Sequence, residues 1–162
     1  MIKIKQAGEH DIKILEGIYL DVVNNFDIWD EDFVSWAGLS REFKPEDFYI
    51  AYVNDEPSGC MALVDTAPFF WTEKIERGEA LFLRRLAVKR SAAGNNLSGY
   101  LMDYAVNKCR EKNIKALRLD CDSGIEKLNK IYSDFGFICE KKETLVIGGA
   151  EYPTAFYIYK IK

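Results

Sequence analysis

The chain has little histidine, little proline and few cysteines. Its single histidine, His10, lies near the N-terminus, and the sequence contains no Gly-x-Ser-x-Gly motif. A Ser-His-Asp hydrolase site would have to use that one histidine, so the sequence argues against a catalytic triad. The cysteines are scattered and indicate neither a disulfide framework nor a zinc site, so we expect reduced core thiols. They are Cys60, Cys109, Cys121 and Cys139.

Long hydrophobic runs are also missing. No apolar stretch approaches the roughly 20 residues that a helix needs to cross a membrane. The N-terminal segment Met1–Gln6 lacks the basic flank and the apolar core of a signal peptide. We therefore expect a cytoplasmic protein with no membrane partner.

Positive charge is not in excess. The net charge is −4, and residues 1–60 hold 13 acidic against 5 basic residues, whereas residues 61–162 hold 13 against 17. An acidic first part argues against a nucleic-acid partner. With 162 residues, 48% of them hydrophobic, the chain can bury a substantial core, and we expect one domain over residues 1–162.

Hydrophobic periodicity predicts an alternation of strands and helices. The expected elements are a strand at 2–6, helices at 11–26 and about 31–43, strands at 48–53, 59–64 and 80–88, a helix from 97, a strand at 115–121, a helix ending before 136, and strands at 137–147 and 152–161. Turn residues predict a hairpin loop at 54–58. The pattern predicts an α/β fold of the α+β type, with a mixed, mostly antiparallel sheet of about seven strands flanked by about four helices.

The most informative stretch runs from Leu86 to Leu101. An apolar strand, Ala80–Val88, breaks into a turn of small residues, and a helix follows. Along that helix, apolar residues recur at every fourth position, with Tyr100 and Tyr104 beside them: Leu97, Leu101, Ala105 and Cys109. Backbone N–H groups at a helix N-terminus form a cradle for phosphate, so the stretch predicts a diphosphate site. An ordinary strand-to-helix connection is the alternative.

A second motif follows the next expected strand. Ser123 and Glu126 form a capping-box pattern that predicts a helix start. Gly136 is placed to end that helix as a C-cap. The apolar face of the helix is expected to hold Ile125, Leu128, Ile131, Tyr132 and Phe135.

These two stretches resemble the signatures of the GNAT N-acetyltransferase superfamily. The turn is similar to the pattern Arg/Gln-x-x-Gly-x-Gly/Ala, with Ala93 at the first position and Asn96 in place of the second key glycine. The run from Tyr132 to Phe137 resembles the pattern Tyr-x-x-x-Gly-Phe. The order of the expected elements is also that of the family, so the resemblance implies a GNAT-like fold over nearly the whole chain.

The resemblance implies an acetyl-CoA-dependent N-acetyltransferase, in which a primary amine attacks the thioester directly. Tyr132 would act as the general acid toward the CoA thiolate, and a buried core tyrosine is the alternative for this residue. No metal is implied. Ile125 stands where many relatives have an asparagine that helps to hold the pantetheine arm. The implied cofactor-binding residues are Leu86, Ala87 and Val88 beside the pantetheine arm, and Gly94, Asn95, Asn96, Leu97, Ser98 and Gly99 around the pyrophosphate.

Several alternatives stay open at this point. Asp65 and Glu79 are candidates for the general base, and each also fits a solvated residue at a strand end. In the family, the acceptor site is walled by segments that here contain Trp29, Trp36, Phe69, Phe70 and Trp71. The acceptor is a small-molecule or peptide amine, and a homodimer is an open alternative. The other function classes are a catalytically silent CoA-binding domain and a protein-interaction domain of the same fold.

Overall fold

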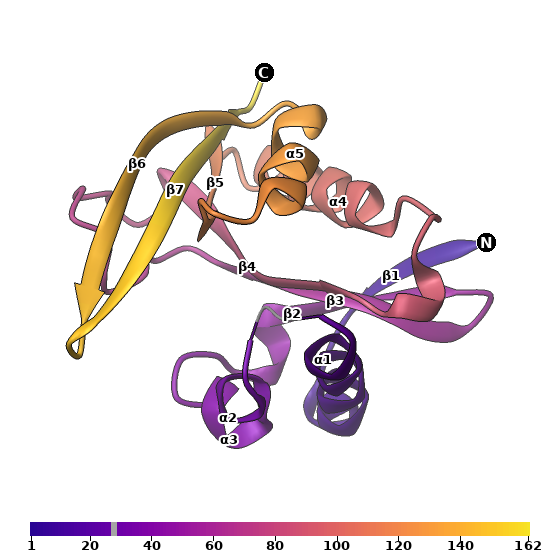
Figure 1. Cartoon of the computed structure of the whole chain (residues 1–162). Helices are drawn as coiled ribbons and strands as arrows, with labels where there is room; N and C mark the ends of the chain where they lie inside the picture. The colour runs from indigo at the N-terminus through magenta and orange to yellow at the C-terminus, as the bar shows by residue number, and fades with distance from the viewer. Residues whose placement is uncertain (27–28) are drawn as a thin grey trace. The chain divides into compact units, whose positions relative to one another are not determined.

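The computed structural model describes residues 1–26 and 29–162. The chain divides into two compact units: unit 1 contains residues 1–63 and 84–104, and unit 2 contains residues 64–83 and 105–162. The elements labelled in Figure 1 are β1 (Ile2–Gln6), α1 (Ile12–Asn25), α2 (Glu31–Val34), α3 (Trp36–Leu39), β2 (Phe48–Val53), β3 (Glu56–Val64), β4 (Ala80–Val88), α4 (Leu97–Glu111), β5 (Ala116–Asp122), α5 (Glu126–Phe135), β6 (Ile138–Ile147) and β7 (Ala150–Lys160). Three short 3-10 helices are η1 (Glu9–Asp11), η2 (Pro45–Asp47) and η3 (Arg90–Ala92).

The strands follow the order β1-β2-β3-β4-β5-β7-β6. Strands β4 and β5 pair in parallel, whereas the pairs β1–β2, β2–β3, β5–β7 and β6–β7 are antiparallel. The expected mixed sheet of about seven strands is therefore confirmed, as are the bounds predicted for β1, β2 and β4.

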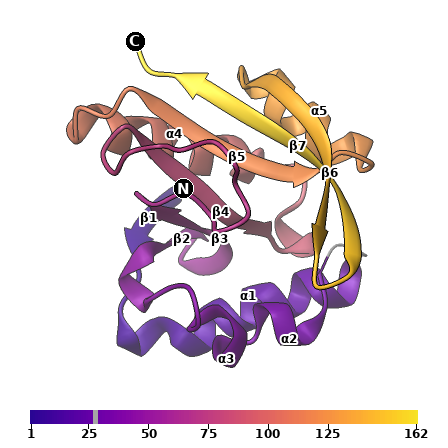
Figure 2. The same cartoon turned by 90° about the vertical axis from the view of Figure 1, so that its left-hand side faces the viewer.

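Helix α1 supplies much of the core of unit 1. Its inward face places Leu15, Ile18, Tyr19 and Val22 at 5% exposure or less. Figures 1 and 2 both show α1, α2 and α3 on the same face of strands β2 and β3. Phe26, which the sequence places on the inward face, is instead 40% exposed because α1 ends at Asn25.

The prediction of a single helix at 31–43 is wrong, because caps at Asp30 and Ser35 produce two short helices, α2 and α3. The Asp30 carboxylate accepts a hydrogen bond from the Phe33 amide and begins α2. Ser35 has extended backbone angles and its hydroxyl accepts from the Gly38 amide, so it ends α2 and begins α3. Serine competes with helix formation in this way through its short hydroxyl. Phe33 is consequently exposed, and Val34 and Leu39 are buried in its place.

The hairpin between β2 and β3 is tighter than expected. Asn54 and Asp55 both have positive φ, +50° and +69°, as in a two-residue turn that matches the twist of the strands. Strand β3 therefore begins at Glu56, and the loop predicted for residues 54–58 is shortened to this turn.

In unit 2, strands β5 and β7 pair along most of their length, and β6 forms a long hairpin with β7. Helix α5 begins without a side-chain cap at Ile125, so the capping role predicted for Ser123 is wrong. The Ser123 amide instead donates to the Pro153 carbonyl. Gly136 ends α5 with φ +122°, which confirms the predicted C-cap.

Helix α4 buries its predicted apolar stripe completely, but Tyr100 is 48% exposed. The four cysteines are free thiols; Cys60 and Cys109 are buried, whereas Cys139 is exposed, so the expectation of a core thiol is wrong for Cys139. Among residues 1–26 and 29–162, no helix is both long and apolar enough to span a membrane. Those same residues contain no cluster of three or more His, Cys, Asp or Glu placed to hold a metal.

Candidate active site

Strand β4 pairs with β5 at its start, within unit 2. The parallel register joins Ala80–Phe82 to Ala116–Arg118. Leu86, Ala87 and Val88 form the other end of the strand and belong to unit 1. These are the three residues predicted to lie beside a pantetheine arm. Their backbone groups can pair with an extended ligand as they would with a further strand.

The turn after β4 contains two residues with positive φ. Gly94 and Asn96 adopt left-handed backbone angles, with φ of +88° and +53°, and helix α4 begins at Leu97. Asn96 thus adopts the conformation that a glycine usually provides, because asparagine tolerates this region better than most residues. The amides of Gly94, Asn96, Leu97 and Ser98 have no hydrogen-bond acceptor among the described residues. Such amides at the start of a 15-residue helix fit a diphosphate.

Local contacts hold this turn in place. The Lys89 amide donates to the Ser58 carbonyl at 2.8 Å, and the Arg90 amide donates to the Asp21 carboxylate at the same distance. A Cβ at Gly99 would lie 2.6 Å from Oδ1 of Asn96. Glycine at position 99 therefore leaves room for the Asn96 side chain against the first turn of α4.

Tyr132 is buried in unit 2 with its ring among other aromatic rings. It is 5% exposed, and its ring centroid lies 6.0 Å from that of Phe137 and 5.8 Å from that of Tyr157. Burial raises the pKa of Tyr132 well above its ordinary value, and the nearby Cys121, Asp120 and Tyr157 add to the rise. The Tyr132 hydroxyl is therefore protonated at neutral pH.

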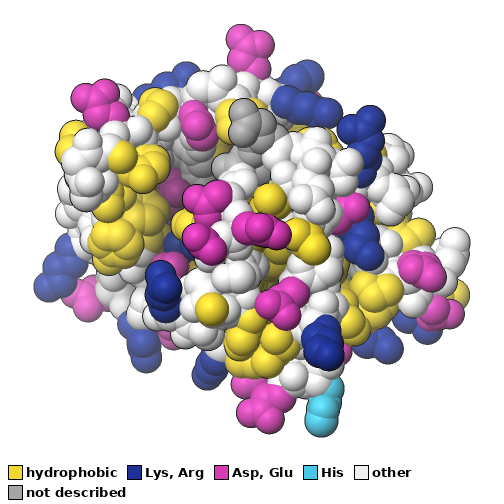
Figure 3. Space-filling view, turned by 60° about the horizontal axis from the view of Figure 1, so that its bottom comes forward, with side chains coloured by type: hydrophobic (Ala, Val, Ile, Leu, Met, Phe, Trp, Pro, Cys, Tyr) yellow, Lys and Arg dark blue, Asp and Glu magenta, His cyan; other side chains and the backbone are white. Residues whose placement is uncertain are grey.

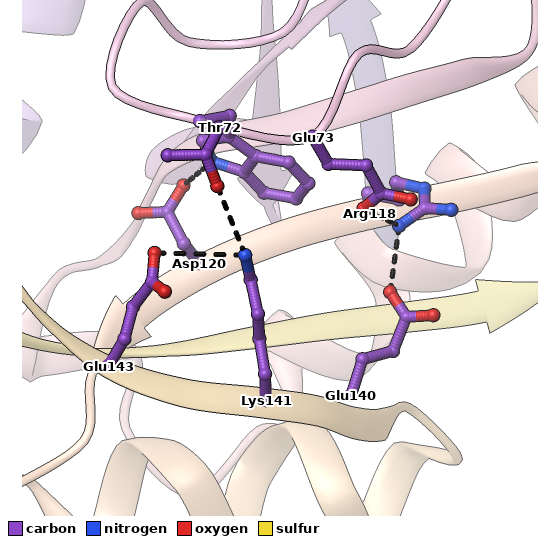
Figure 4. Close-up of polar contacts among 8 residues, drawn as sticks. Thr72, Glu73, Arg118, Asp120, Glu140, Lys141 and Glu143 are labelled. Carbon is purple, nitrogen blue, oxygen red and sulfur yellow. Dashed lines mark hydrogen bonds and ion pairs between the residues drawn. The ribbon is translucent and has the colours of Figure 1, made fainter.

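Three consecutive residues before β4 each contact a different residue on β5 or β6 (Figure 4). The contacts are Trp71 Nε1 donating to Asp120 Oδ2 at 2.8 Å, Lys141 Nζ donating to Thr72 Oγ1 at 3.3 Å, and Arg118 pairing with Glu73 at 3.4 Å. The Trp71 ring also packs edge-on against Phe82 and Phe156, each at 5.1 Å. The segment 71–73 therefore lies across this face of β5 and β6, with Asp120 beneath it.

Asp120 is the carboxylate that the sequence analysis missed. Leu117 and Leu119 are buried, whereas Arg118 and Asp120 alternate with them and are only partly buried. Charged residues at alternate positions of an apolar strand were the available signal. Of the two carboxylates that were expected, Asp65 pairs with Arg77 at 3.6 Å and is about half exposed, and Glu79 is exposed. Asp120, by contrast, accepts a hydrogen bond from the Trp71 indole.

The comparisons with known proteins identify the family. The model of the Acetyltransferase (GNAT) family matches residues 15–137. The chain belongs to the GNAT acetyltransferase family. Acetyl-CoA is the acetyl donor that this family uses.

Solved structures share the GNAT fold along the whole chain at low sequence identity. An N-acetyltransferase from Staphylococcus aureus Mu50 has a TM-score of 0.76 at 17% identity, and covers 100% of this chain and 99% of its own. A ribosomal-protein-alanine N-acetyltransferase from Brucella melitensis has a TM-score of 0.76 at 18% identity, and the match covers 98% of this chain and 99% of that protein. The protein yncA from Salmonella typhimurium, solved with its cofactor acetyl-CoA, has a TM-score of 0.69 at 14% identity, and the match covers 100% of this chain and 95% of that protein. No curated protein sequence matches the chain.

Ile125 stands just before α5, and an asparagine, Asn129, lies one turn further along the chain. The Asn129 amide nitrogen donates to the carbonyls of Asp122 and Ile125, at 3.0 and 2.8 Å. Its amide oxygen accepts from the Tyr157 hydroxyl at 2.6 Å. Asn129 therefore fixes the start of α5 and the Tyr157 ring, and its amide is used within the protein.

The aromatic residues expected to wall the acceptor site of this GNAT chain have different environments. Trp29 packs on Tyr19, and Trp36 packs on Phe48, both within unit 1. In unit 2, Phe69 is 81% exposed and stacks edge-on with Phe70. Trp71 is the one that bonds directly to a candidate catalytic carboxylate.

Proposed function

We propose that the chain is an acetyl-CoA-dependent N-acetyltransferase that transfers the acetyl group to a primary amine of a small molecule or a peptide. Residues 1–162 would serve as one catalytic domain. The observation that carries the proposal is the turn at the start of α4, where the amides of Gly94, Asn96, Leu97 and Ser98 have no protein acceptor in the described chain. This cradle matches the diphosphate of the donor that the family uses.

The cradle and the end of β4 would hold the two parts of the cofactor. The amides of Gly94, Asn96, Leu97 and Ser98 would bind the pyrophosphate, and the backbone of Leu86–Val88 would pair with the pantetheine amides. The Asn95 amide, also predicted here, donates to the Ala92 carbonyl at 3.4 Å instead. Bound acetyl-CoA supplies an acetyl group already activated as a thioester. The protein has to orient this group, supply a proton to the leaving thiolate and remove a proton from the acceptor ammonium.

Tyr132 would supply the proton that the leaving thiolate needs. A general acid must carry its proton at working pH, and the raised pKa of Tyr132 secures this.

Asp120 would take the proton that an acceptor ammonium must lose before it can attack. Its carboxylate lies under the segment 71–73, where the Trp71 indole N–H holds one oxygen at 2.8 Å. Burial raises the pKa of Tyr132, and the charge of Asp120, which belongs to the same unit, adds to the rise. An aromatic wall beside a carboxylate suits an ammonium group.

Nucleic acid is not among the proposed partners. Asp30, Glu31 and Asp32 are exposed at the start of α2. In Figure 3, Asp and Glu side chains gather near the middle of the face shown, and Lys and Arg side chains lie around them. Exposed carboxylates such as those at the start of α2 repel a phosphate backbone.

Acetyl-CoA is expected to stabilise the protein, and Gly99→Val is expected to remove that effect. At a hundredfold excess over Kd, the ligand should raise the free energy of unfolding by about 2.7 kcal/mol. A Cβ at position 99 would lie 2.6 Å from Oδ1 of Asn96, so a valine there displaces the side chain of a residue that belongs to the turn. Thermal unfolding with and without acetyl-CoA measures both results.

The matched control is Gly17→Val, because Gly17 also lies in a helix and a Cβ there meets nothing within 4 Å. This control should keep the full shift in unfolding temperature. A shift that survives in Gly99→Val would mean that the turn is only a connection. The absence of any shift in the unaltered protein at millimolar acetyl-CoA would refute the proposed function.

A further inference from the structure

The contacts and the backbone of Arg85 indicate a bulge in strand β4. The guanidinium groups of Arg84 and Arg85 both reach Glu42, at 2.6 and 3.8 Å, and both lie over the Phe43 ring, at 5.2 and 5.5 Å from its centroid. Consecutive side chains of a regular strand point to opposite faces, so two neighbours on one face indicate a bulge. Arg85 also has a left-handed φ of +54°. The regular alternation of side chains between the two faces of β4 is therefore interrupted at Arg85 and starts again at Leu86.

The carbonyl of Arg85 is bonded by a residue of helix α1. The Tyr19 hydroxyl donates to this carbonyl at 2.6 Å, and the Tyr19 side chain has no exposed surface. A bulge turns a backbone group out of the ladder, and a buried carbonyl needs a donor. A non-glycine residue in left-handed conformation costs roughly 1–2 kcal/mol, so the surroundings must favour it. The hydroxyl of Tyr19 is the group that does so here.

Tyr19 is itself held rigidly in unit 1. Its ring packs edge-on against Trp29 and Phe48, with centroid distances of 5.9 and 6.3 Å. Burial raises the pKa of Tyr19, and burial raises the pKa of the neighbouring Cys60 thiol to about 12. Both groups are therefore neutral, and the Tyr19 hydroxyl keeps the proton that it donates.

The other end of the same stretch is also fixed. The Lys89 amide donates to the Ser58 carbonyl, and a Cβ at Gly59 would lie 2.9 Å from the Ala87 carbonyl oxygen. The backbone of β3 thus approaches Ala87 as closely as glycine allows. Between this anchor and the bulge lie Leu86, Ala87 and Val88, whose orientation then depends on the conformation of Arg85.

We propose that Tyr19 is a positioning residue for acetyl-CoA. By bonding the Arg85 carbonyl, it keeps the bulge and determines which backbone groups of Leu86–Val88 face the edge that the pantetheine arm would use. A strand that relaxed to regular alternation at Arg85 would present the alternate set of groups. The inference rests on the proposed function, since it assumes that this edge binds the cofactor.

The test is Tyr19→Phe, which keeps the buried ring and removes only the hydroxyl. The affinity for acetyl-CoA should fall about tenfold, consistent with a buried carbonyl left without a donor. The affinity for phospho-ADP, the nucleotide half of CoA, should stay within about twofold, because that fragment has no pantetheine arm and contacts only the cradle. Calorimetric titration with both ligands gives the two values. Tyr49→Phe, which removes a hydroxyl from another buried tyrosine of unit 1, should leave both affinities unchanged.

A second variant separates the bulge from general packing. Glycine adopts positive φ without strain, so Arg85→Gly should reduce the effect of Tyr19→Phe on acetyl-CoA affinity when the two are combined. If Tyr19→Phe lowered the affinities for acetyl-CoA and phospho-ADP equally, or lowered neither, the positioning role would be overturned. Failure of acetyl-CoA to bind the unaltered protein would overturn the proposed function first, and this inference with it.

Discussion

Replacing Tyr132 with phenylalanine is expected to lower kcat by about a hundredfold, the usual size of a general-acid contribution. The affinity for acetyl-CoA should change little, because the ring keeps its packing against Phe137 and Tyr157 and only the hydroxyl is lost. The measurement is kcat with the best acceptor, together with a cofactor titration of the same preparation.

The pH dependence follows from the direction of the pKa shift. Because burial raises the pKa of Tyr132, this group stays protonated through the neutral range and beyond pH of about 10, the ordinary value for tyrosine. Loss of activity at pH 8 to 9 should therefore not come from Tyr132, and the phenylalanine variant should keep the shape of the profile in that range. Tyr152→Phe, at a half-exposed position of the β6–β7 hairpin, is the control and should remain as fast as the unaltered protein. A Tyr132→Phe variant with unchanged kcat would remove Tyr132 from the mechanism and leave it a core residue.

Asp120→Asn is expected to lower kcat/KM for the acceptor by about a hundredfold or more near neutral pH, as the loss of a general base does. Asparagine keeps an oxygen that can accept the Trp71 indole N–H, so the segment 71–73 should stay in place. What the variant loses is the ability to accept a proton. The measurement is kcat/KM for the acceptor against pH, in which the variant should lose the acidic limb.

The neighbouring carboxylate provides the control for this prediction. Asp122 lies on the same strand, and its carboxylate accepts a hydrogen bond from the Gly124 amide. Asp122→Asn should therefore leave kcat/KM within about twofold, since it removes the same charge from a group bonded to the backbone. Equal losses in the two variants would indicate a general effect of negative charge near the site and would contradict a base role for Asp120.

The sequence predicted the strongly periodic elements well because their signals are local. The alternating strand at Ile2–Gln6 and the apolar strand at Ala80–Val88 have the bounds that were expected. The break at Ser35 was missed because one serine hydroxyl, bonding one amide, outweighed a helical pattern of apolar residues.

The residues of the candidate site also differ in whether their signals are local in the sequence. The phosphate turn was predictable because its small residues are contiguous, and Asn96 adopts the angle that its side chain tolerates. Asp120 and Tyr19 were not predictable. Their contacts join residues 49 and 66 positions apart, so no local pattern could pair Trp71 with Asp120 or Tyr19 with Arg85.

The central claim is acetyl transfer from acetyl-CoA to an amine, and one measurement tests it most directly. The full chain is incubated with acetyl-CoA and a panel of small primary amines and of peptides with free N-termini or lysines. Mass spectrometry then quantifies N-acetylated product against the CoA thiol released. The account predicts at least one amine for which the two appear in equal amounts, at a rate that falls in Tyr132→Phe. Binding of acetyl-CoA with no acetylated product from any amine would contradict it and would indicate a silent CoA-binding domain.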